Sequence, residues 1–176
     1  MLFDFFNIVS ELKKIPRKGW KEKLGLQTPE SVADHSYVTA IMAMIISDLN
    51  GLDTQKILKM SLLHDLAESI TGDLMPEEIS KIDKVELENQ TISDIFAKLP
   101  ANLAVEYSKI WNEYQEGKSK EANLVHEVDR LEMALQARKY RLEGAPEDKL
   151  ETFFSSARKD IKNKDILKIL DEISYK

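Results

Sequence analysis

The sequence predicts an all-α protein, and three observations lead to this expectation. Glycine and proline are scarce, with 6 and 5 in 176 residues. Charged residues make up 32% of the chain, and charged helix formers are abundant among them. Apolar residues recur three and four positions apart, which is the periodicity of an amphipathic helix. We expect a single-domain helical bundle over residues 1–176, because 43% hydrophobic residues can fill one core.

The first expected helix covers about residues 4–14 and ends before Pro16, since the residue that precedes a proline is disfavoured in a helix. Residues 17–27 are expected to form a loop. Thr28 and Pro29 then predict the start of a second helix, with threonine as the cap and proline in the first turn.

The second helix should continue to about Leu49, where Asn50-Gly51 stops it. Asp53 predicts the cap of a third helix, over about residues 54–70, which Gly72 closes. Further helices are expected over about 76–98 in pieces, 101–116, 120–143, 147–161 and 165–174, with breaks at Leu99-Pro100, Gly117 and Gly144-Ala145-Pro146. The helix over 120–143 has more apolar residues than one stripe requires, so either the core or a subunit interface could use them.

Composition limits the classes of function. The chain has no cysteine, which excludes disulfides and thiolate metal sites and suits a reducing cytoplasm. No apolar run approaches the roughly 20 residues that span a bilayer, and the N-terminus lacks the features of a signal peptide. The net charge of −6, with both signs mixed, argues against a surface that binds long nucleic acids. We expect a soluble cytoplasmic protein without membrane or nucleic acid polymer partners, and a small anionic substrate is compatible with this charge.

The most informative pattern is His35, then His64-Asp65, then Asp129 far downstream. Two imidazoles and two carboxylates suit Mn²⁺, Co²⁺, Fe²⁺ or Mg²⁺ better than a structural zinc ion. His64 and Asp65 lie in an apolar stretch, where an unpaired charge would be costly. Helices of a bundle can bring such residues together around a metal ion. A hydrogen-bonded core network is the alternative that the residues leave open.

Other polar residues lie near these positions in the sequence. Glu68 follows His64 by one helical turn and should project with it, and Gly72-Asp73 breaks the helix directly afterwards. His126 lies one turn before Asp129, but no second acidic position pairs with it, so we expect it to be structural or exposed. Asp34 lies near a helix start, where compensation of the helix dipole explains it.

Four segments of the chain resemble the HD-domain superfamily of metal-dependent phosphohydrolases, and within it the 5′-deoxynucleotidase group. The segments are Ile15-Pro16-Arg17-Lys18-Gly19-Trp20, Glu30-Ser31-Val32-Ala33-Asp34-His35-Ser36, His64-Asp65-Leu66-Ala67-Glu68-Ser69-Ile70-Thr71-Gly72-Asp73-Leu74 and Val128-Asp129-Arg130-Leu131-Glu132. The resemblance implies an HD-domain helical bundle that hydrolyses deoxyribonucleoside 5′-monophosphates to a deoxynucleoside and phosphate. Relatives in this group are commonly dimers, so we expect a homodimer.

The resemblance also implies site residues. It makes His35, His64, Asp65 and Asp129 the ligands of a catalytic divalent cation, which is Mn²⁺, Co²⁺ or Mg²⁺. Glu68, Asp73 and the backbone of Leu74 are candidate ligands of a second ion. The expected catalytic residues are Arg17, which orients the phosphate, and Glu68 and Asp73, which divide proton transfer and the sugar contact between them. The expected substrate contacts are Arg17, Trp20, His35, Asp65, Asp73 and Leu74.

Alternatives stay open at this point. Arg17 could be an exposed charge at a helix end, and Trp20 could belong to the core. Glu68 could form a salt bridge with a lysine, and Asp73 could cap the next turn. The protein could act on another nucleotide, as a triphosphohydrolase or phosphodiesterase, or it could be a non-catalytic module that binds a metal or nucleotide.

Overall fold

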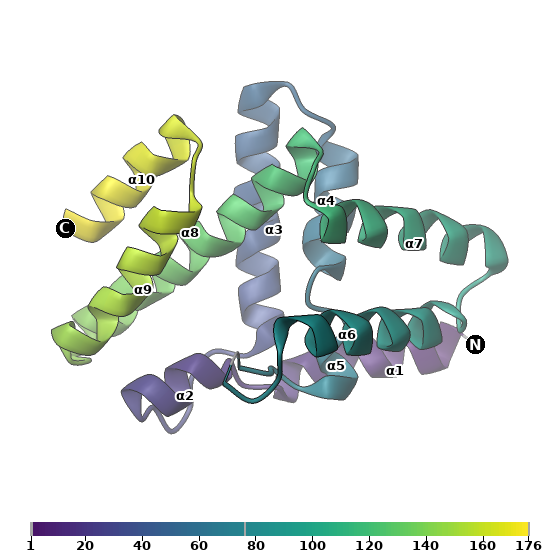
Figure 1. Ribbon diagram of the computed structural model, residues 1–176, viewed down its shortest axis with the longest axis horizontal. Coiled ribbons are helices and arrows are strands. Elements are labelled where there is room, and N and C mark those ends of the chain that lie inside the picture. Colours follow the sequence, from purple (N-terminus) through teal and green to yellow (C-terminus); the bar gives the residue numbers. More distant parts are fainter. Residues whose placement is uncertain (1, 76, 176) are drawn as a thin grey trace.

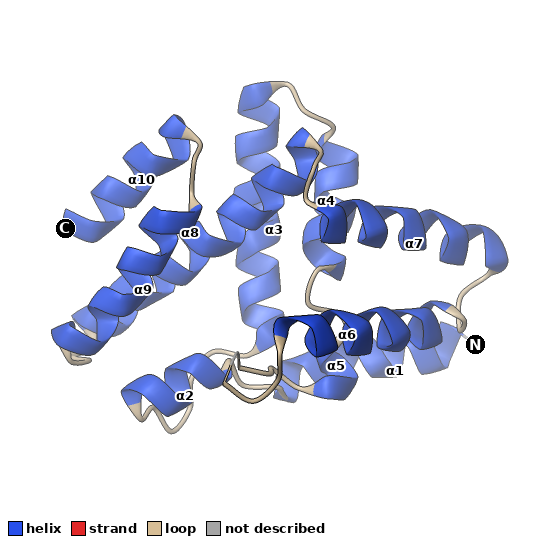
Figure 2. Cartoon of the chain, in the orientation of Figure 1, coloured by secondary structure: helices blue, strands red, loops and turns tan. Residues whose placement is uncertain are grey.

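The computed structural model describes residues 2–75 and 77–175, and within these residues it has helices and no β-strands (Figure 2). An isolated β-bridge pairs Pro16 with Ser31. The helices are α1 (Leu2–Glu11), the 3₁₀ turn η1 (Leu12–Lys14), α2 (Lys18–Leu24), α3 (Val32–Asn50), α4 (Thr54–Leu63), α5 (Glu68–Thr71), α6 (Lys81–Phe96), α7 (Ala101–Glu116), α8 (Lys120–Leu142), α9 (Glu147–Asp160) and α10 (Lys164–Tyr175). The predicted all-α class is confirmed. None of these helices is long and apolar enough to cross a membrane.

Helix α8 is central to the arrangement (Figure 1). It packs against α3 on one side, and α9 and α10 lie along it towards the C-terminus. Helices α6 and α7 lie side by side at the other end of the molecule, with α1 next to α6. The extra apolar residues of α8 are used in the core, because Leu124, Val125, Val128, Leu131, Met133, Ala134 and Ala137 are all buried.

Local sequence signals explain most helix ends. Asp53 accepts a hydrogen bond from the backbone of Lys56 as the cap of α4, as predicted. Helix α3 ends at Gly51 and α7 at Gly117, each in the left-handed conformation that glycine adopts without strain. The predicted boundaries from α7 to α10 agree with the structure to within a residue or two.

The expected loop over 17–27 is wrong, because the structure has helix α2 there. Its two buried residues, Trp20 and Leu24, are one turn apart and face the core. The ring of Trp20 packs on Phe153 of α9, with 4.2 Å between ring centroids. Tertiary burial of this face stabilises a short helix that local sequence signals do not reveal.

The expected start of the second helix at Thr28 is also wrong. Helix α3 begins at Val32, with Ser31 as its cap. The side chains of Ser31 and Asp34 bond each other's backbone N–H groups in a capping box, which gives Asp34 a local function at the helix start. The preceding residues are extended instead, because Arg17 N–H donates to the carbonyl of Glu30 and Val32 N–H to that of Ile15.

The expected third helix is interrupted. Helix α4 ends at Leu63, a turn covers 64–67, and α5 follows. Backbone bonds tighten here to three-residue spacing, as from Leu66 N–H to the Leu63 carbonyl and from Glu68 N–H to the Asp65 carbonyl. Further along, α6 begins at Lys81 behind the cap Ser80. Pro76, expected to open this helical stretch, lies outside the described residues.

Candidate metal centre

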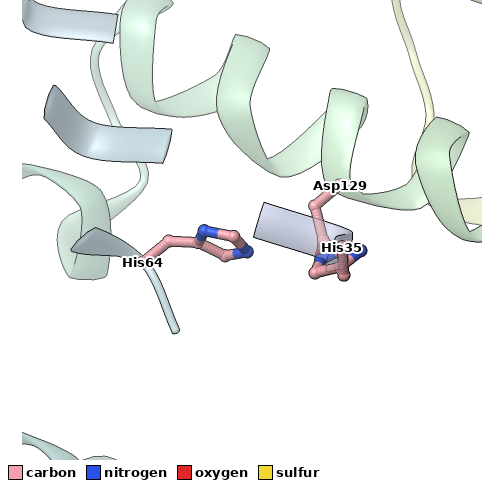
Figure 3. A group of neighbouring side chains, drawn as sticks. All are labelled: His35, His64 and Asp129. Atoms are coloured by element: carbon pink, nitrogen blue, oxygen red, sulfur yellow. The ribbon is translucent and has the colours of Figure 1, made fainter. Parts of the chain in front are cut away.

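Three different helices bring His35, His64 and Asp129 together (Figure 3). His35 is in the first turns of α3, His64 directly follows α4, and Asp129 is midway along α8. One ligand atom of each lies within 4.8 Å of the other two. In Figure 3 the imidazole of His64 points towards His35 and Asp129. The structure therefore places three of the four predicted metal ligands around one point.

Asp65 lies at the same point. Its Oδ2 atom is 3.2 Å from Nε2 of His64 and 3.7 Å from Nε2 of His35. On the other side of His35, Oδ1 of Asp129 is 3.1 Å from the same Nε2 atom. Two imidazole nitrogens and two carboxylates thus face one another, as the sequence pattern predicts.

Each imidazole is also held by a hydrogen bond through its second ring nitrogen, Nδ1. Nδ1 of His64 donates to the backbone carbonyl of Ser61 at 2.6 Å, and Nδ1 of His35 is 2.6 Å from Oε2 of Glu132. A proton on Nδ1 leaves a lone pair on Nε2. Both Nε2 atoms are buried, and neither has a hydrogen-bond partner within the described part of the chain. Buried imidazole nitrogens that face two carboxylates fit the donor set that a divalent cation needs.

The charges of these groups are interdependent. Burial raises the pKa of Asp65, but the imidazole of His64 and the charge of Arg17 outweigh burial and hold the pKa well below its usual value. Burial likewise raises the pKa of Asp129, and contact with His35 reverses this effect. For His35, burial and Arg17 lower the pKa, but Asp129 and Glu132 raise it to about 9. Both carboxylates are therefore ionised at neutral pH, and a cation would compete with a proton for Nε2.

Arg17 faces the cluster and is not an exposed helix end. Its guanidinium donates to Oδ2 of Asp65 at 3.4 Å, and its side chain is 17% exposed. Burial lowers the pKa of Arg17, but the carboxylates of Asp65, Asp129, Glu68 and Asp73 outweigh it and raise the pKa. A guanidinium in this position carries positive charge directly beside the candidate metal centre and can donate hydrogen bonds to two anionic oxygens at once.

Glu68 is buried at 3% exposure, and its Oε2 atom has no hydrogen-bond partner among the described residues. Its Oε1 atom is 4.0 Å from the ammonium of Lys84. Burial raises the pKa of Glu68 well above its usual value, and the charges of Asp65 and Asp73 add to this effect. The lysine contact considered from the sequence is present, but it leaves one carboxylate oxygen free.

Asp73 bonds the start of α2. Its carboxylate accepts the backbone N–H of Lys18 at 2.7 Å, in the first turn of α2. The Leu74 carbonyl, a candidate ligand of a second ion, accepts a bond from Lys84 at 3.2 Å. The ammonium of Lys84 therefore already lies between Leu74 and Glu68.

Trp20 combines both interpretations that the sequence left open. It is 2% exposed and packs in the core, and its indole N–H donates to the Glu30 carboxylate at 2.9 Å. It also lies in the wall of the cavity described below. His126 has a structural role, as expected, since its Nε2 bonds the carbonyl of Tyr114 and its ring stacks on that tyrosine.

Sequence reasoning missed three residues around the site: Glu30, Lys84 and Glu132. Glu132 is fully buried, and it follows Asp129 by three residues on the same helix. A carboxylate on the apolar face of a helix, beside Val128 and Leu131, is the kind of signal that identified Asp65. Glu30 and Lys84 have no comparable signal, because their roles depend on neighbours from other helices.

A cavity of about 640 Å³ opens onto the cluster. Its volume lies within the range of small-molecule sites. The residues that line it include Arg17, Trp20, His64, Asp65, Glu68, Asp73, Leu74, Lys81, Lys84, Glu88, Tyr114, His126, Asp129, Arg130, Met133 and Phe153. Polar, charged and aromatic side chains thus surround a space of suitable size for a nucleotide.

Comparisons with known proteins agree with this arrangement. The sequence profile of the family described as HD domain matches residues 9–170. The chain is 37% identical over 174 residues to 5′-deoxynucleotidase HDDC2 of Homo sapiens, covering 98% of this chain and 84% of the relative. It is 39% identical over 168 residues to 5′-deoxynucleotidase HDDC2 of Dictyostelium discoideum, covering 88% and 87%. The crystal structure of the PH0347 protein from Pyrococcus horikoshii OT3 superposes with a TM-score of 0.80 at 34% identity, covering 97% of both chains.

Proposed function

The chain belongs to the HD-domain family, and from this premise we propose that it is an enzyme that hydrolyses deoxyribonucleoside 5′-monophosphates to a deoxynucleoside and phosphate. Relatives that align over almost the whole chain are named 5′-deoxynucleotidases. The observation that carries the proposal is the pair of buried, unpartnered Nε2 atoms of His35 and His64, which face two carboxylates beside the guanidinium of Arg17.

His35, His64, Asp65 and Asp129 are the proposed ligands of one divalent cation. Mn²⁺, Co²⁺ and Mg²⁺ are the proposed metals, because the donor set contains two imidazoles, two carboxylates and no sulfur. When bound, the ion supplies positive charge to the phosphoryl group and makes a water molecule more acidic. A second ion at Glu68, Asp73 and Leu74 would have to displace the ammonium of Lys84, so a single ion is the simpler proposal.

Arg17 is proposed to bind the phosphate. Its guanidinium lies next to Asp65 across a long contact of 3.4 Å, so an incoming phosphate can take over its N–H donors. A planar guanidinium can hold two phosphate oxygens at once and so fix the direction of the ester bond.

Glu68 is proposed to take the proton from the attacking water. A raised pKa suits a general base near neutral pH, and Oε2 of Glu68 is free to accept a proton. Asp73 is proposed to contact the sugar or the leaving oxygen, because one of its carboxylate oxygens is already held by α2. Trp20, whose edge lies in the cavity wall, is proposed to limit the space for the sugar.

Three further expectations remain proposals of ours. The whole chain is proposed to form one HD domain, in keeping with the match over residues 9–170. A homodimer is proposed, and the stripe of exposed apolar residues Tyr37, Ile41, Ile45 and Leu49 along α3 supports an association surface. The lack of cysteine supports a cytoplasmic location.

A substrate screen tests the function. The purified protein is stripped of metal with a chelator and assayed for phosphate release from dAMP, dCMP, dGMP, dTMP and dUMP and from the matching ribonucleotides, with Mn²⁺, Co²⁺ or Mg²⁺ added back. We expect metal-dependent release from the deoxynucleotides. Release from triphosphates or cyclic dinucleotides alone would move the activity to another phosphohydrolase class, and no release from any of them would defeat the proposal.

A further inference from the structure

A second group of acidic side chains lies on the far side of His35 from the candidate metal centre. Carboxylate oxygens of Glu30 and Glu132 and an imidazole nitrogen of His35 lie within 4.8 Å of one another. Glu132 is fully buried, and Glu30 is partly buried. Two carboxylates beside one imidazole have two physical explanations: they hold a cation of their own, or they support the side chains of the neighbouring site.

Hydrogen bonding decides between these explanations. Nδ1 of His35 is 2.6 Å from Oε2 of Glu132, a distance that requires a shared proton. When Nε2 of His35 binds a cation, the proton of the neutral imidazole lies on Nδ1 and is donated to Oε2 of Glu132, so Nδ1 has no lone pair for a second cation. The same proton leaves the lone pair on Nε2, which faces His64 and Asp129.

Glu132 also distinguishes the two histidines. His64 is held by the neutral carbonyl of Ser61, whereas His35 is held by a carboxylate. A carboxylate partner fixes the ring orientation and makes the imidazole a stronger electron donor to a metal ion. Because both atoms are buried, water cannot replace this hydrogen bond if Glu132 is removed.

Glu30 connects this group of acidic side chains to the residues that are expected to contact the substrate. Its carboxylate accepts the indole N–H of Trp20, and its backbone carbonyl accepts the N–H of Arg17, both at 2.9 Å. Its own backbone N–H donates to the hydroxyl of Tyr140, on α8, at 2.9 Å. One residue thus fixes both the arginine and the tryptophan of the α2 segment relative to α8.

We propose that Glu132 and Glu30 support the active site and do not form a second cation site. Glu132 positions His35 as a metal ligand, and the carboxylate of Glu30 positions Trp20 for the substrate. This inference rests on the proposed metal centre. It assigns separable effects to two neighbouring carboxylates: loss of Glu132 weakens metal binding, and loss of Glu30 weakens substrate binding.

The test compares Glu132→Gln, Glu132→Leu and Glu30→Leu with the wild type in the full chain. Cobalt is titrated into metal-stripped protein, and both the affinity and the visible absorption spectrum of bound Co²⁺ are recorded. We expect one Co²⁺ per wild-type chain. Glu132→Gln should weaken cobalt binding by about 10- to 100-fold and change the spectrum, and Glu132→Leu should do more. At saturating metal, Glu132→Gln should lower kcat and leave KM unchanged.

Glu30→Leu, which removes the acceptor of the Trp20 indole N–H, should have the opposite pattern, with a raised KM for the nucleotide and an unchanged affinity and spectrum for cobalt. Glu127→Gln is the matched control. Glu127 is also on α8, but its carboxylate accepts the backbone N–H groups of Lys162 and Asn163, away from the metal centre. This control should lower the melting temperature without changing cobalt binding. Glu132→Gln keeps nearly the same volume, so it carries the test if Glu132→Leu does not fold.

Two results would overturn the inference. One is a folded Glu132→Gln protein that binds cobalt with wild-type affinity and spectrum. The other is a wild-type chain that binds two Co²⁺ ions, one of which is lost on Glu30→Leu or Glu132→Gln, because the carboxylates would then form a cation site. A wild-type chain that binds no metal and releases no phosphate would instead defeat the proposed function itself, and the inference with it.

Discussion

The carboxylate of Asp73 accepts the backbone N–H of Lys18, so a residue from the loop after α5 holds the first turn of α2 in place. Lys18 directly follows Arg17, whose guanidinium lies beside Asp65. The position of the arginine at the cavity therefore depends on a residue that lies more than fifty positions later in the chain.

Replacing Asp73 with Ala should displace Arg17 and raise KM for the nucleotide by about tenfold or more, the equivalent of one lost hydrogen bond to a charged group. The free energy of unfolding should fall by about 1 kcal/mol, since the first turn of α2 loses the hydrogen bond from the Lys18 N–H to Asp73. Steady-state kinetics and thermal unfolding measure the two effects. Asp53→Ala is the control, because it removes the cap of α4 and should leave KM unchanged. Equal KM values for the two variants would contradict the link to Arg17.

Replacing Arg17 with Lys should reduce kcat/KM by about 10- to 100-fold, although the positive charge is kept. An ammonium cannot form the paired hydrogen bonds by which a guanidinium orients a phosphate. Arg138→Lys, on α8 and outside the cavity wall, serves as the control. Wild-type kinetics for Arg17→Lys would show that charge alone is needed at this position.

Replacing Glu68 with Gln should lower kcat by about 10²- to 10⁴-fold and leave metal binding unchanged, if the carboxylate accepts the proton of the attacking water. In the wild type only ionised Glu68 can act as a base, so kcat should rise with pH through its raised pKa. The variant should lose this rise. A pH–rate profile measures both effects. A Glu68→Gln protein whose kcat still rises with pH as in the wild type would exclude this role.

The metal-free protein should lose stability as the pH rises. Because Asp129 and Glu132 raise the pKa of His35 to about 9, protonated His35 stabilises the folded state. This contribution is fully present below about pH 6.5, the ordinary pKa of histidine, and is lost as the pH passes 9. Melting temperatures of chelator-treated wild type and His35→Gln should differ in this window. Parallel pH curves for the two proteins would show that His35 does not carry this charge.

The fold could be predicted from the sequence wherever local signals end a helix. Gly51 and Gly117 mark helix ends that the structure has at the same places, and Pro100 marks the start of α7. Helix α2 could not be predicted, because burial of Trp20 against a residue more than a hundred positions away stabilises it. The turn after α4 was missed for a related reason: a helical periodicity continues through 64–67, although the hydrogen bonds there have three-residue spacing.

The candidate metal ligands of the site could be predicted from the sequence, but the residues that hold these ligands in position could be predicted less well. His35, His64, Asp65 and Asp129 were identified by residue type and setting, and the structure brings them together. The roles of Glu30 and Lys84 could not be predicted, because each acts through partners in other parts of the chain. Glu132 is marked by its place on the apolar face of α8, but its partner could not be predicted. No spacing in the sequence indicates that Glu132 bonds His35, which precedes it by 97 positions.

The central claim is that His35, His64, Asp65 and Asp129 hold one divalent ion. Calorimetric titration of Mn²⁺ into metal-stripped wild type and His64→Gln tests it most directly, with circular dichroism to confirm that both proteins are folded. We predict one bound Mn²⁺ per wild-type chain and a loss of at least about 100-fold in affinity for His64→Gln. A folded His64→Gln protein that binds Mn²⁺ as tightly as the wild type would contradict the claim.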